Sequence, residues 1–313
     1  MAGGRTVAGS GVWPVLAAAV LWGTVGPAQV LADTEVAPVA LGACRMLLGG
    51  AVLALFTVRR AGLRTLWRPG VRGAMVVGVL VTAAFQVCFL EAVARSGAAV
   101  ATAVAFGTVP VVAGLTARRS AGERLGARWG VGTAGAVAGI ALLLLPGETG
   151  RASGPGVLLA VGAGASFGSY IAVTGRLAER GADTAAAAPI SVLCAGVLVS
   201  PGLSAAPQHL AEPGSLLLIG WLALGTTALG YLLFTRGVGR LSAATVGTLS
   251  LTEPLVATLL GLALLGERLG VAGGCGAALL LGGLVLVSWP RRRTRAVLSG
   301  REPGVLPEPS PAE

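Results

Sequence analysis

The hydrophobic positions of this chain fall into long continuous runs, separated by short polar or charged segments. Ten such runs can be marked, at 12–31, 36–58, 73–91, 98–117, 129–146, 156–175, 185–204, 215–235, 242–265 and 271–289. Each is close to the roughly 20 residues that an α-helix needs to cross the hydrocarbon core of a bilayer. Because the runs are continuous and do not alternate, they favour helices over the strands of a membrane barrel. The pattern therefore predicts an all-α integral membrane protein with ten transmembrane helices.

A repeat divides these runs into two groups. The pentapeptide Gly-Glu-Arg-Leu-Gly occurs at 122–126 and again at 266–270, an offset of 144 residues. The same offset pairs Pro110 with Pro254, Gly132 with Gly276 and Gly139 with Gly283. Such self-similarity indicates two copies of one structural unit. Since each copy holds an odd number of spans, five, the second copy is expected to enter the membrane inverted relative to the first, as in many secondary transporters.

The runs and the repeat together predict how the chain is organised. Two five-helix repeats are expected at 11–146 and 156–290, joined by an outer linker at 147–155. A cytoplasmic tail at 1–10 precedes them. Residues 291–313 begin with a basic cluster and are expected to continue as a disordered cytoplasmic tail. Both termini therefore belong on the same side of the membrane.

The distribution of charge agrees with this topology. Charged residues make up 12% of the chain, compared with about 25% in soluble domains, and hydrophobic residues make up 54%. All 23 basic residues are arginines. With a cytoplasmic N-terminus, 19 fall in cytoplasmic segments, three (Arg95, Arg151 and Arg268) in outer loops, and one, Arg45, inside a span. Basic residues concentrate in cytoplasmic loops, so the net charge of +10 reflects topology and a nucleic-acid partner is not expected.

Residues that would carry metal or catalytic chemistry are sparse. The four cysteines lie within spans and form no CxxC pair, so they are interpreted as small buried residues; they are Cys44, Cys88, Cys194 and Cys275. His209, the only histidine, lies in a predicted outer loop without acidic or cysteine neighbours that would complete a metal site. No metal, cofactor or enzymatic activity is expected.

Glu253, near the middle of the ninth run, is the first candidate for a functional site. An ionisable residue in hydrocarbon is costly unless it is paired or hydrated. Pro254 follows it, and Pro110 holds the matching place in the first repeat. A proline frees a backbone carbonyl and interrupts its helix, and paired interruptions in two inverted halves point to a transport site. Thr252 adds a hydroxyl group beside Glu253.

Two interpretations of Glu253 remain open. It can line a hydrated cavity at the midplane, where burial disfavours its charged form and the carboxyl group could exchange a proton that couples transport to a gradient. Alternatively, it belongs to a structural kink and is satisfied by a neighbouring helix. Arg45 is equally open, because it can pair with Glu253 or present its planar fork to a carboxylate or phosphate of the substrate.

Five further side chains are candidates to line a pore: Trp22, Gln86, Phe167, Tyr170 and Tyr231. Core packing explains each of them equally well. Trp22 stands in Leu-Trp-Gly-Thr at 21–24, and the equivalent segment of the second repeat is Ser-Phe-Gly-Ser at 166–169. A glycine beside an aromatic residue lets helices approach closely while the ring faces a cavity.

Small residues at four-residue spacing recur in the fifth and tenth runs. The pairs are Gly126 with Gly130, Gly135 with Gly139, and Gly270 with Gly274. This spacing is typical of a close-packing helix face. These two spans are therefore expected to form a scaffold or a homodimer contact.

The chain resembles the EamA branch of the drug/metabolite transporter (DMT) superfamily over about 11–289. The resemblance is carried by Trp22-Gly23-Thr24, Arg45-Met46-Leu47-Leu48, Pro110 with the first pentapeptide, and Leu251-Thr252-Glu253-Pro254-Leu255 with the second. It implies ten helices as two inverted five-helix repeats around a central cavity. Many such proteins export amino acids, metabolites or drugs, often with presumed proton coupling. The two copies differ because Ile190 stands opposite Arg45 and Val109 opposite Glu253, which predicts an asymmetric cavity.

These observations together predict a multi-pass transporter of the inner cell membrane, and not an enzyme. It is expected to move a small metabolite, amino acid or drug-like compound, as an exporter and with protons as the candidate coupling ion. A non-transporting membrane scaffold or regulatory subunit, and a passive channel, are the alternatives.

Overall fold

The computed structural model describes residues 11–121, 125–144, 153–205, 207–264 and 270–288. The predicted tails at 1–10 and 291–313 lie outside the described residues, as do most of both pentapeptides and of the predicted outer linker. Within the described ranges every regular element is a helix.

The helices follow the ten hydrophobic runs closely. The first repeat comprises α1 (Val12–Gly23), α2 (Val25–Ala32), α3 (Pro38–Thr57), α4 (Arg60–Leu66), α5 (Arg72–Ser96), α6 (Ala98–Ala121) and α7 (Ala127–Leu144). The second comprises α8 (Gly154–Glu179), α9 (Thr184–Val199), the short η2 (Ser200–Ala205) and η3 (Pro207–Ala211), α10 (Pro213–Trp221), the π-helix η4 (Leu222–Leu229), α11 (Gly230–Val238), α12 (Ala243–Leu249), α13 (Thr252–Leu264) and α14 (Val271–Ser288). In this part of the chain nine helical segments are long and apolar enough to cross a membrane, and α7 is a shorter apolar helix. The short α4 was not predicted.

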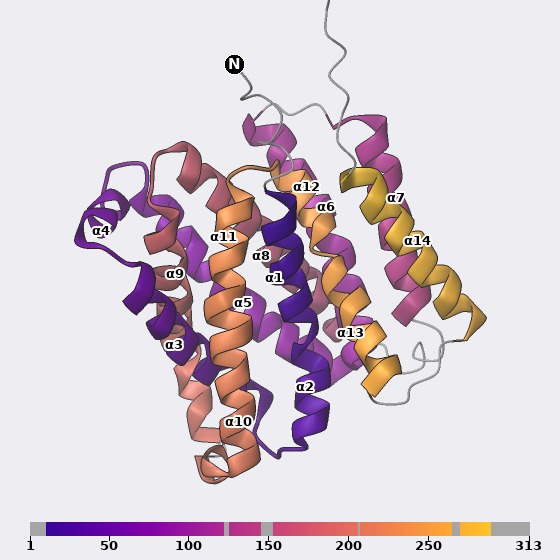
Figure 1. The fold of residues 1–313 in the computed structure, drawn as a ribbon, viewed down its shortest axis with the longest axis horizontal. Coiled ribbons are helices and arrows are strands. Elements are labelled where there is room, and N and C mark those ends of the chain that lie inside the picture. Colours follow the sequence, from indigo (N-terminus) through magenta and orange to yellow (C-terminus); the bar gives the residue numbers. More distant parts are fainter. Residues whose placement is uncertain (1–10, 122–124, 145–152, 206, 265–269, 289–313) are drawn as a thin grey trace, which may run out of the picture.

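The helices of the two repeats pack against each other in an inverted arrangement. The first span of each repeat lies antiparallel to the third span of the other repeat. α1 packs against α11 in this way, and α8 packs against α5. Ser96 at the end of α5 hydrogen bonds to Ser153 at the start of α8, while Arg180 just after α8 donates to the carbonyl of Gly70 just before α5. Correspondingly, Gly11 before α1 contacts Gly237 near the end of α11. In Figure 1, α1 begins and α14 ends at the same, upper end of the bundle.

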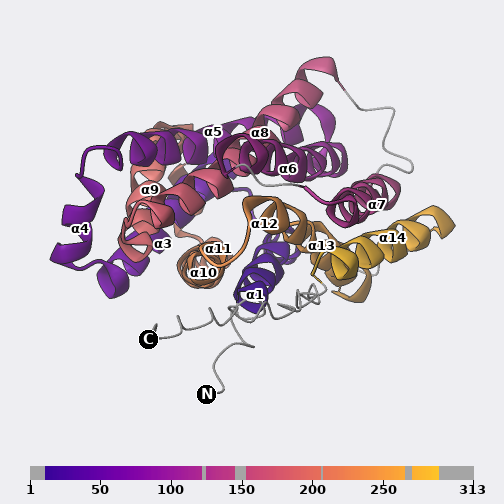
Figure 2. The same ribbon diagram turned by 90° about the horizontal axis from the view of Figure 1, so that it is seen from above.

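The fifth spans, α7 and α14, show the same symmetry at atomic detail. A Cβ atom built on Gly132 would lie 3.0 Å from the carbonyl oxygen of Gly283, and one built on Gly139 would lie 2.7 Å from that of Gly276. The repeat offset pairs Gly132 with Gly276 and Gly139 with Gly283, so the two contacts are symmetry mates across an antiparallel helix pair. Figure 2 shows α7 and α14 side by side at one edge of the bundle.

The expected close-packing glycines were mostly the wrong ones. A Cβ atom built on any of four of the predicted glycines would have no atom within 4 Å and would face open space; they are Gly130, Gly135, Gly270 and Gly274. Gly139, one of the predicted glycines, does take part in the contact, together with Gly132, Gly276 and Gly283, which were not among the predicted pairs. The prediction that these spans form a scaffold holds for the pairing of α7 with α14, whereas the homodimer contact stays a prediction.

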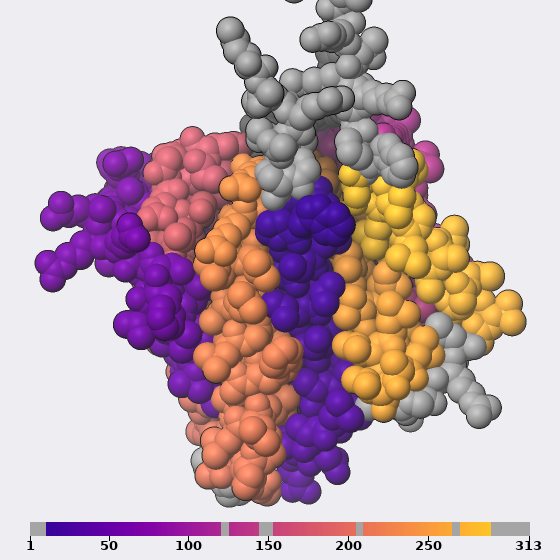
Figure 3. All heavy atoms as spheres, in the orientation of Figure 1, coloured from indigo at the N-terminus to yellow at the C-terminus, as the bar shows by residue number. Residues whose placement is uncertain are grey.

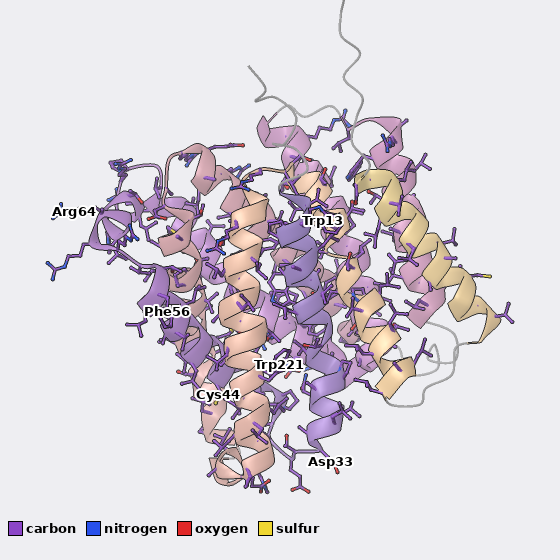
Figure 4. The ribbon with its side chains drawn as sticks, viewed as in Figure 1. Trp13, Asp33, Cys44, Phe56, Arg64 and Trp221 are labelled. Carbon is purple, nitrogen blue, oxygen red and sulfur yellow. The ribbon has the colours of Figure 1, made fainter. Side chains whose placement is uncertain are left out.

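Large apolar side chains cover the outer surface of the bundle. Phe56 is 81% exposed and points away from the helices in Figure 4, and Leu217 and Val271 are exposed to a similar degree. A water-soluble protein rarely exposes extended apolar surface of this kind. The outward face is therefore suited to contact with lipid tails.

Three neighbouring spans are interrupted at their centres. α1 gives way to α2 at Thr24, η4 separates α10 from α11, and Ser250 and Leu251 separate α12 from α13. In Figure 3 the first of these spans lies between the other two on one face of the molecule. Their repeat equivalents, α8, α5 and α6, run without a break. The prediction that Pro110 interrupts its helix is thus wrong, because Pro110 lies inside a continuous α6. Pro254 falls in the first turn of α13, where the N–H group that proline lacks would have no partner within the helix.

Candidate functional site

Trp22, at the end of α1, lies at the contact between the two repeats. Its indole nitrogen donates a hydrogen bond of 2.8 Å to the carbonyl oxygen of Thr226, which belongs to η4. Gly230 allows this approach, because a Cβ atom there would lie 2.7 Å from the same nitrogen. Single turns of π-helix often mark functional sites. Thr24, just beyond the end of α1, accepts a second hydrogen bond through its hydroxyl group, from the indole nitrogen of Trp221 at 3.0 Å (Figure 4).

An aromatic cluster surrounds Trp22. Its ring centroid lies 5.9 Å from that of Phe167, 5.5 Å from that of Tyr231 and 5.3 Å from that of Phe234. Tyr170 extends the cluster, with its centroid 6.0 Å from that of Tyr231. Phe85, Phe89 and Phe106 continue it through Phe167. Both tyrosines of the chain belong to this cluster, and since Trp22 and Phe167 are repeat equivalents, it lies where the two halves meet.

Arg45 projects from α3 toward α5. Its guanidinium group donates to the side-chain oxygen of Gln86 at 2.9 Å. Gln86 is only 6% exposed. Gly42, one turn before Arg45, leaves the room that this contact needs, because a side chain at that position would collide with the Gln86 amide. The partner of Arg45 within hydrogen-bonding distance is thus a neutral side chain.

Glu253 faces Arg45 from the opposite repeat. Arg45, Tyr231 and Glu253 are close enough to interact electrostatically with one another. Arg45 and Glu253, which both lie in the described part of the chain, form no ion pair within 4.0 Å and so face each other across a wider gap. The hydrogen bonds of the described residues leave the Glu253 carboxylate without a partner. Arg45, Tyr231 and Glu253 are each only partly buried, although they lie within the bundle.

Two buried hydroxyl groups at this site also lack partners. Tyr170 and Thr252 are 4% and 8% exposed, and neither hydroxyl oxygen has a hydrogen-bond partner among the described residues. A buried polar atom without a partner costs about 1–3 kcal/mol. The site therefore combines an aromatic wall with several polar groups whose hydrogen-bonding capacity is unused.

The same backbone contact occurs in both repeats, but only one copy carries charge. A Cβ atom on Gly23 would meet the carbonyl oxygen of Glu253 at 2.7 Å, and one on Gly168 would meet that of Val109 at 2.9 Å. Gly23 and Gly168 are repeat equivalents, as are Glu253 and Val109. Ile190, opposite Arg45 in the repeat, packs into an apolar cluster with Met75 and Val173 among others. The two repeats therefore differ in charge at equivalent positions, since Arg45 and Glu253 correspond to the apolar residues Ile190 and Val109.

The structure thus brings Arg45, Gln86, Tyr231, Glu253 and Trp22 together, with Tyr170 and Thr252 adjoining. Pro254 lies beside them at the start of α13, whereas Pro110 packs against Gly247 of α12 within the core. Phe89 and Phe234 also belong to the cluster and were not predicted, although an offset of 145 residues relates them. The π-helix η4 was not predicted either, because the sequence carries no signal for it.

His209 has acidic neighbours, contrary to expectation. One ring nitrogen lies 2.8 Å from a Glu212 carboxylate oxygen, and the other lies 3.7 Å from Glu35. In the described part of the chain no group of three histidine, cysteine or acidic side chains could hold a metal ion. The four cysteines are free thiols, but the expectation that they are buried is wrong: Cys44 and Cys88 are partly buried, and Cys194 and Cys275 are exposed.

Comparison with known proteins agrees with this architecture. The model of the EamA-like transporter family matches residues 9–145 and again 154–289. The chain is 34% identical to an uncharacterized transporter, YwfM, of Bacillus subtilis over 90% of this chain and 94% of that protein. It is 28% identical to an uncharacterized inner membrane transporter, YicL, of Salmonella typhimurium over 91% of this chain and 98% of that protein. A solved crystal structure that is 23% identical covers 88% of this chain and 96% of its own, with a TM-score of 0.75, and so shares the fold.

The family model matches the chain twice in tandem, and the two matches together cover most of it. YwfM and YicL align with the chain over nearly their whole lengths. Members of this family are typically transporters and not enzymes. The chain is a multi-pass membrane protein that belongs to the EamA-like transporter family.

Proposed function

We propose that this protein is a secondary transporter that exports a small organic compound across the inner membrane by alternating access. The observation that carries the proposal is the pair Arg45 and Glu253. Two opposite charges from opposite inverted repeats lie within the bundle, partly accessible and not in direct contact. Ionisable groups in a membrane protein mark substrate or ion pathways. The substrate-binding residues in this proposal are Arg45, Gln86, Trp22, Tyr170, Tyr231, Thr252 and Glu253.

Proton coupling is part of the proposal. Glu253 carries no hydrogen bond from the described residues and sits in the first turn of α13, directly after the break in the ninth span. A carboxyl group placed in this way can gain and lose a proton as the surrounding helices move. Coupling would then require that Glu253 be exposed alternately to the two sides of the membrane.

The orientation is also proposed. Basic segments of the sequence cluster at one end of the bundle, the end at which α1 begins and α14 ends, and basic loops are normally cytoplasmic. We therefore assign both termini to the cytoplasm and the η2–η3 segment to the outer side.

Transport by purified protein in liposomes tests the function. A pH gradient should drive saturable movement of the substrate, and Glu253→Gln should abolish this gradient-driven movement while exchange down a substrate gradient persists. The matched control is Glu91→Gln, which removes an exposed carboxylate paired with Arg95 and should transport normally.

The alternatives give different results in the same assay. A passive channel would show flux that does not saturate and ignores the pH gradient. A scaffold or regulatory subunit would move no solute. A thermal-shift screen of metabolites would supply the substrate, because a ligand that binds only the folded state raises the melting temperature.

A further inference from the structure

We infer that the substrate is an organic monoanion with an aromatic or apolar body, and that its anionic group replaces Glu253 as the counter-charge of Arg45. The inference rests on the proposed transport function and specifies the chemical class of the substrate. It is drawn from the charge balance of the site, its unused hydrogen-bond donors and its aromatic wall.

The charge balance comes first. Arg45 is held by the neutral Gln86 amide, and the opposite charge that acts on it, Glu253, lies beyond direct contact. A guanidinium group offers five N–H donors, and Gln86 takes one of them. The remaining donors suit a carboxylate, which a guanidinium binds with two parallel hydrogen bonds. A single arginine balances one negative charge, whereas a phosphate monoester carries about two.

The unused donors and the rings specify the rest of the molecule. The Tyr170 hydroxyl, buried and without a partner, can donate to an anionic oxygen or to a polar substituent. Trp22, Phe167 and Phe234 are packed in the buried core behind these polar groups, and Tyr231, which is only partly buried, is the ring of the aromatic wall that remains accessible. A compact ion would make little use of the Tyr231 ring, so a ring or branched apolar group is the better complement.

Binding of the anion changes the state of Glu253. In the empty site Glu253 supplies the counter-charge of Arg45. When a substrate anion contacts Arg45 directly, a second negative charge nearby becomes unfavourable, and the Glu253 carboxylate takes up one proton from solvent. The charged or titratable groups that face Glu253 in the described structure are Arg45 on α3 and Tyr231 on α11. The site therefore keeps one positive and one negative charge throughout, and each bound anion brings one proton with it. Export then carries the anion and the proton outward together and is driven by the outward gradient of the substrate.

Opposite effects of two substitutions distinguish the possible substrate classes. For a monoanion, Glu253→Gln removes a competing charge and tightens binding, while Arg45→Gln abolishes it. For a cationic amine the two effects exchange places. For a zwitterion, in which Arg45 holds the carboxylate and Glu253 the ammonium group, both substitutions weaken binding.

The experiment uses the purified full chain and four probes that share a phenyl ring. They are phenylacetate, the neutral phenylacetamide, the cationic phenethylamine and zwitterionic phenylalanine, with indole-3-acetate and benzoate as further monoanions. Affinity and proton uptake are measured by titration calorimetry in two buffers of different ionisation enthalpy. The variants are Glu253→Gln and Arg45→Gln, with the surface substitutions Glu91→Gln and Arg95→Gln as matched controls.

We expect the monoanions to bind at least tenfold more tightly than phenylacetamide, with uptake of about one proton per anion. Glu253→Gln should tighten monoanion binding about tenfold and eliminate the proton uptake, and the control variants should match the unmodified protein. If Arg45→Gln does not fold, the gain of affinity in Glu253→Gln still decides the question, because a misfolded variant cannot bind more tightly.

Three results would overturn the inference. They are weaker monoanion binding in Glu253→Gln, tighter binding of the amine or of phenylalanine than of phenylacetate, and no binding of any monoanion at millimolar concentration. If liposomes containing the protein still transport another class of solute, the proposed function stands although the inference fails. Conversely, monoanion binding without transport would refute the proposed function and leave the binding assignment intact.

Discussion

The contact between α7 and α14 gives the sharpest quantitative prediction, because it is made by backbone atoms that cannot move aside. A Cβ atom on Gly139 would lie 2.5 Å from the backbone nitrogen of Leu280 and 2.7 Å from the carbonyl oxygen of Gly276. Ordinary carbon contacts begin near 3.5 Å, so Gly139→Ala must separate the two helices by roughly 1 Å. Overpacking of this kind costs about 1–3 kcal/mol.

The matched control lies one turn away on the same helix. A Cβ atom on Gly135 would have no atom within 4 Å, so Gly135→Ala adds a methyl group to open space and gains up to about 1 kcal/mol of helix propensity. The difference between the two variants should therefore be about 1–4 kcal/mol. This corresponds to a difference in melting temperature of at least roughly 2 °C, with the melting temperature of Gly139→Ala below that of the unmodified protein and that of Gly135→Ala equal or higher.

The assay is thermal unfolding of each purified variant in one detergent, monitored by fluorescence or by loss of the monodisperse peak in size-exclusion chromatography. Gly276→Ala serves as a second test, because it meets the symmetry-related backbone of α7 and should behave like Gly139→Ala. Equal melting temperatures for the Gly139 and Gly135 variants would refute the close contact, and with it the symmetric pairing of the fifth spans.

Three further predictions address the site and the topology. Trp22→Phe keeps the ring contacts but removes the hydrogen bond to the Thr226 carbonyl, so it should lower stability by about 1 kcal/mol, and an unchanged melting temperature would show that the bond contributes nothing. Arg45→Ala should stop transport or lower the yield of folded protein, and normal yield with normal flux would remove Arg45 from both roles. Single cysteines that replace Arg64 and Ala211, in a chain whose native cysteines are replaced, should react with an impermeant thiol reagent from opposite sides of the membrane. Arg64 is suitable because it projects from the bundle in Figure 4, whereas the neighbouring Gly62 is packed against Asp183. Labelling of both from one side would contradict the assigned topology.

Much of the site was visible in the sequence because ionisable and aromatic residues are rare in these spans. Arg45 and Glu253 stood out by their charge alone, and the repeat offset placed Trp22 opposite Phe167. The sequence did not reveal which partner Arg45 takes, since Gln86 lies 41 residues away on another helix and only packing brings the two side chains together. Nor did it distinguish the glycines that contact a neighbouring helix from those that face open space.

Proline was a weaker guide than expected for a physical reason. Pro110 and Pro254 occupy equivalent positions, yet α6 continues through Pro110 and the ninth span breaks just before Glu253. A proline removes one hydrogen bond in either case. Whether the helix breaks depends on what surrounds it, and around Pro110 the close approach of Gly247 packs α12 against a continuous helix.

The number and length of the spans, their division into two repeats and their inversion follow from the sequence by itself. In hydrocarbon every backbone polar group must be satisfied within its own helix, so hydrophobicity along the chain is sufficient to place the helices, and an odd number of spans per repeat dictates the inversion. Tertiary structure alone decided the interruptions at Thr24 and Ser250, the π-helix of the eighth span and the partners of the charged residues. These features depend on contacts between distant segments, such as the bond from Trp22 to a carbonyl 204 residues away, and no local pattern encodes such a contact.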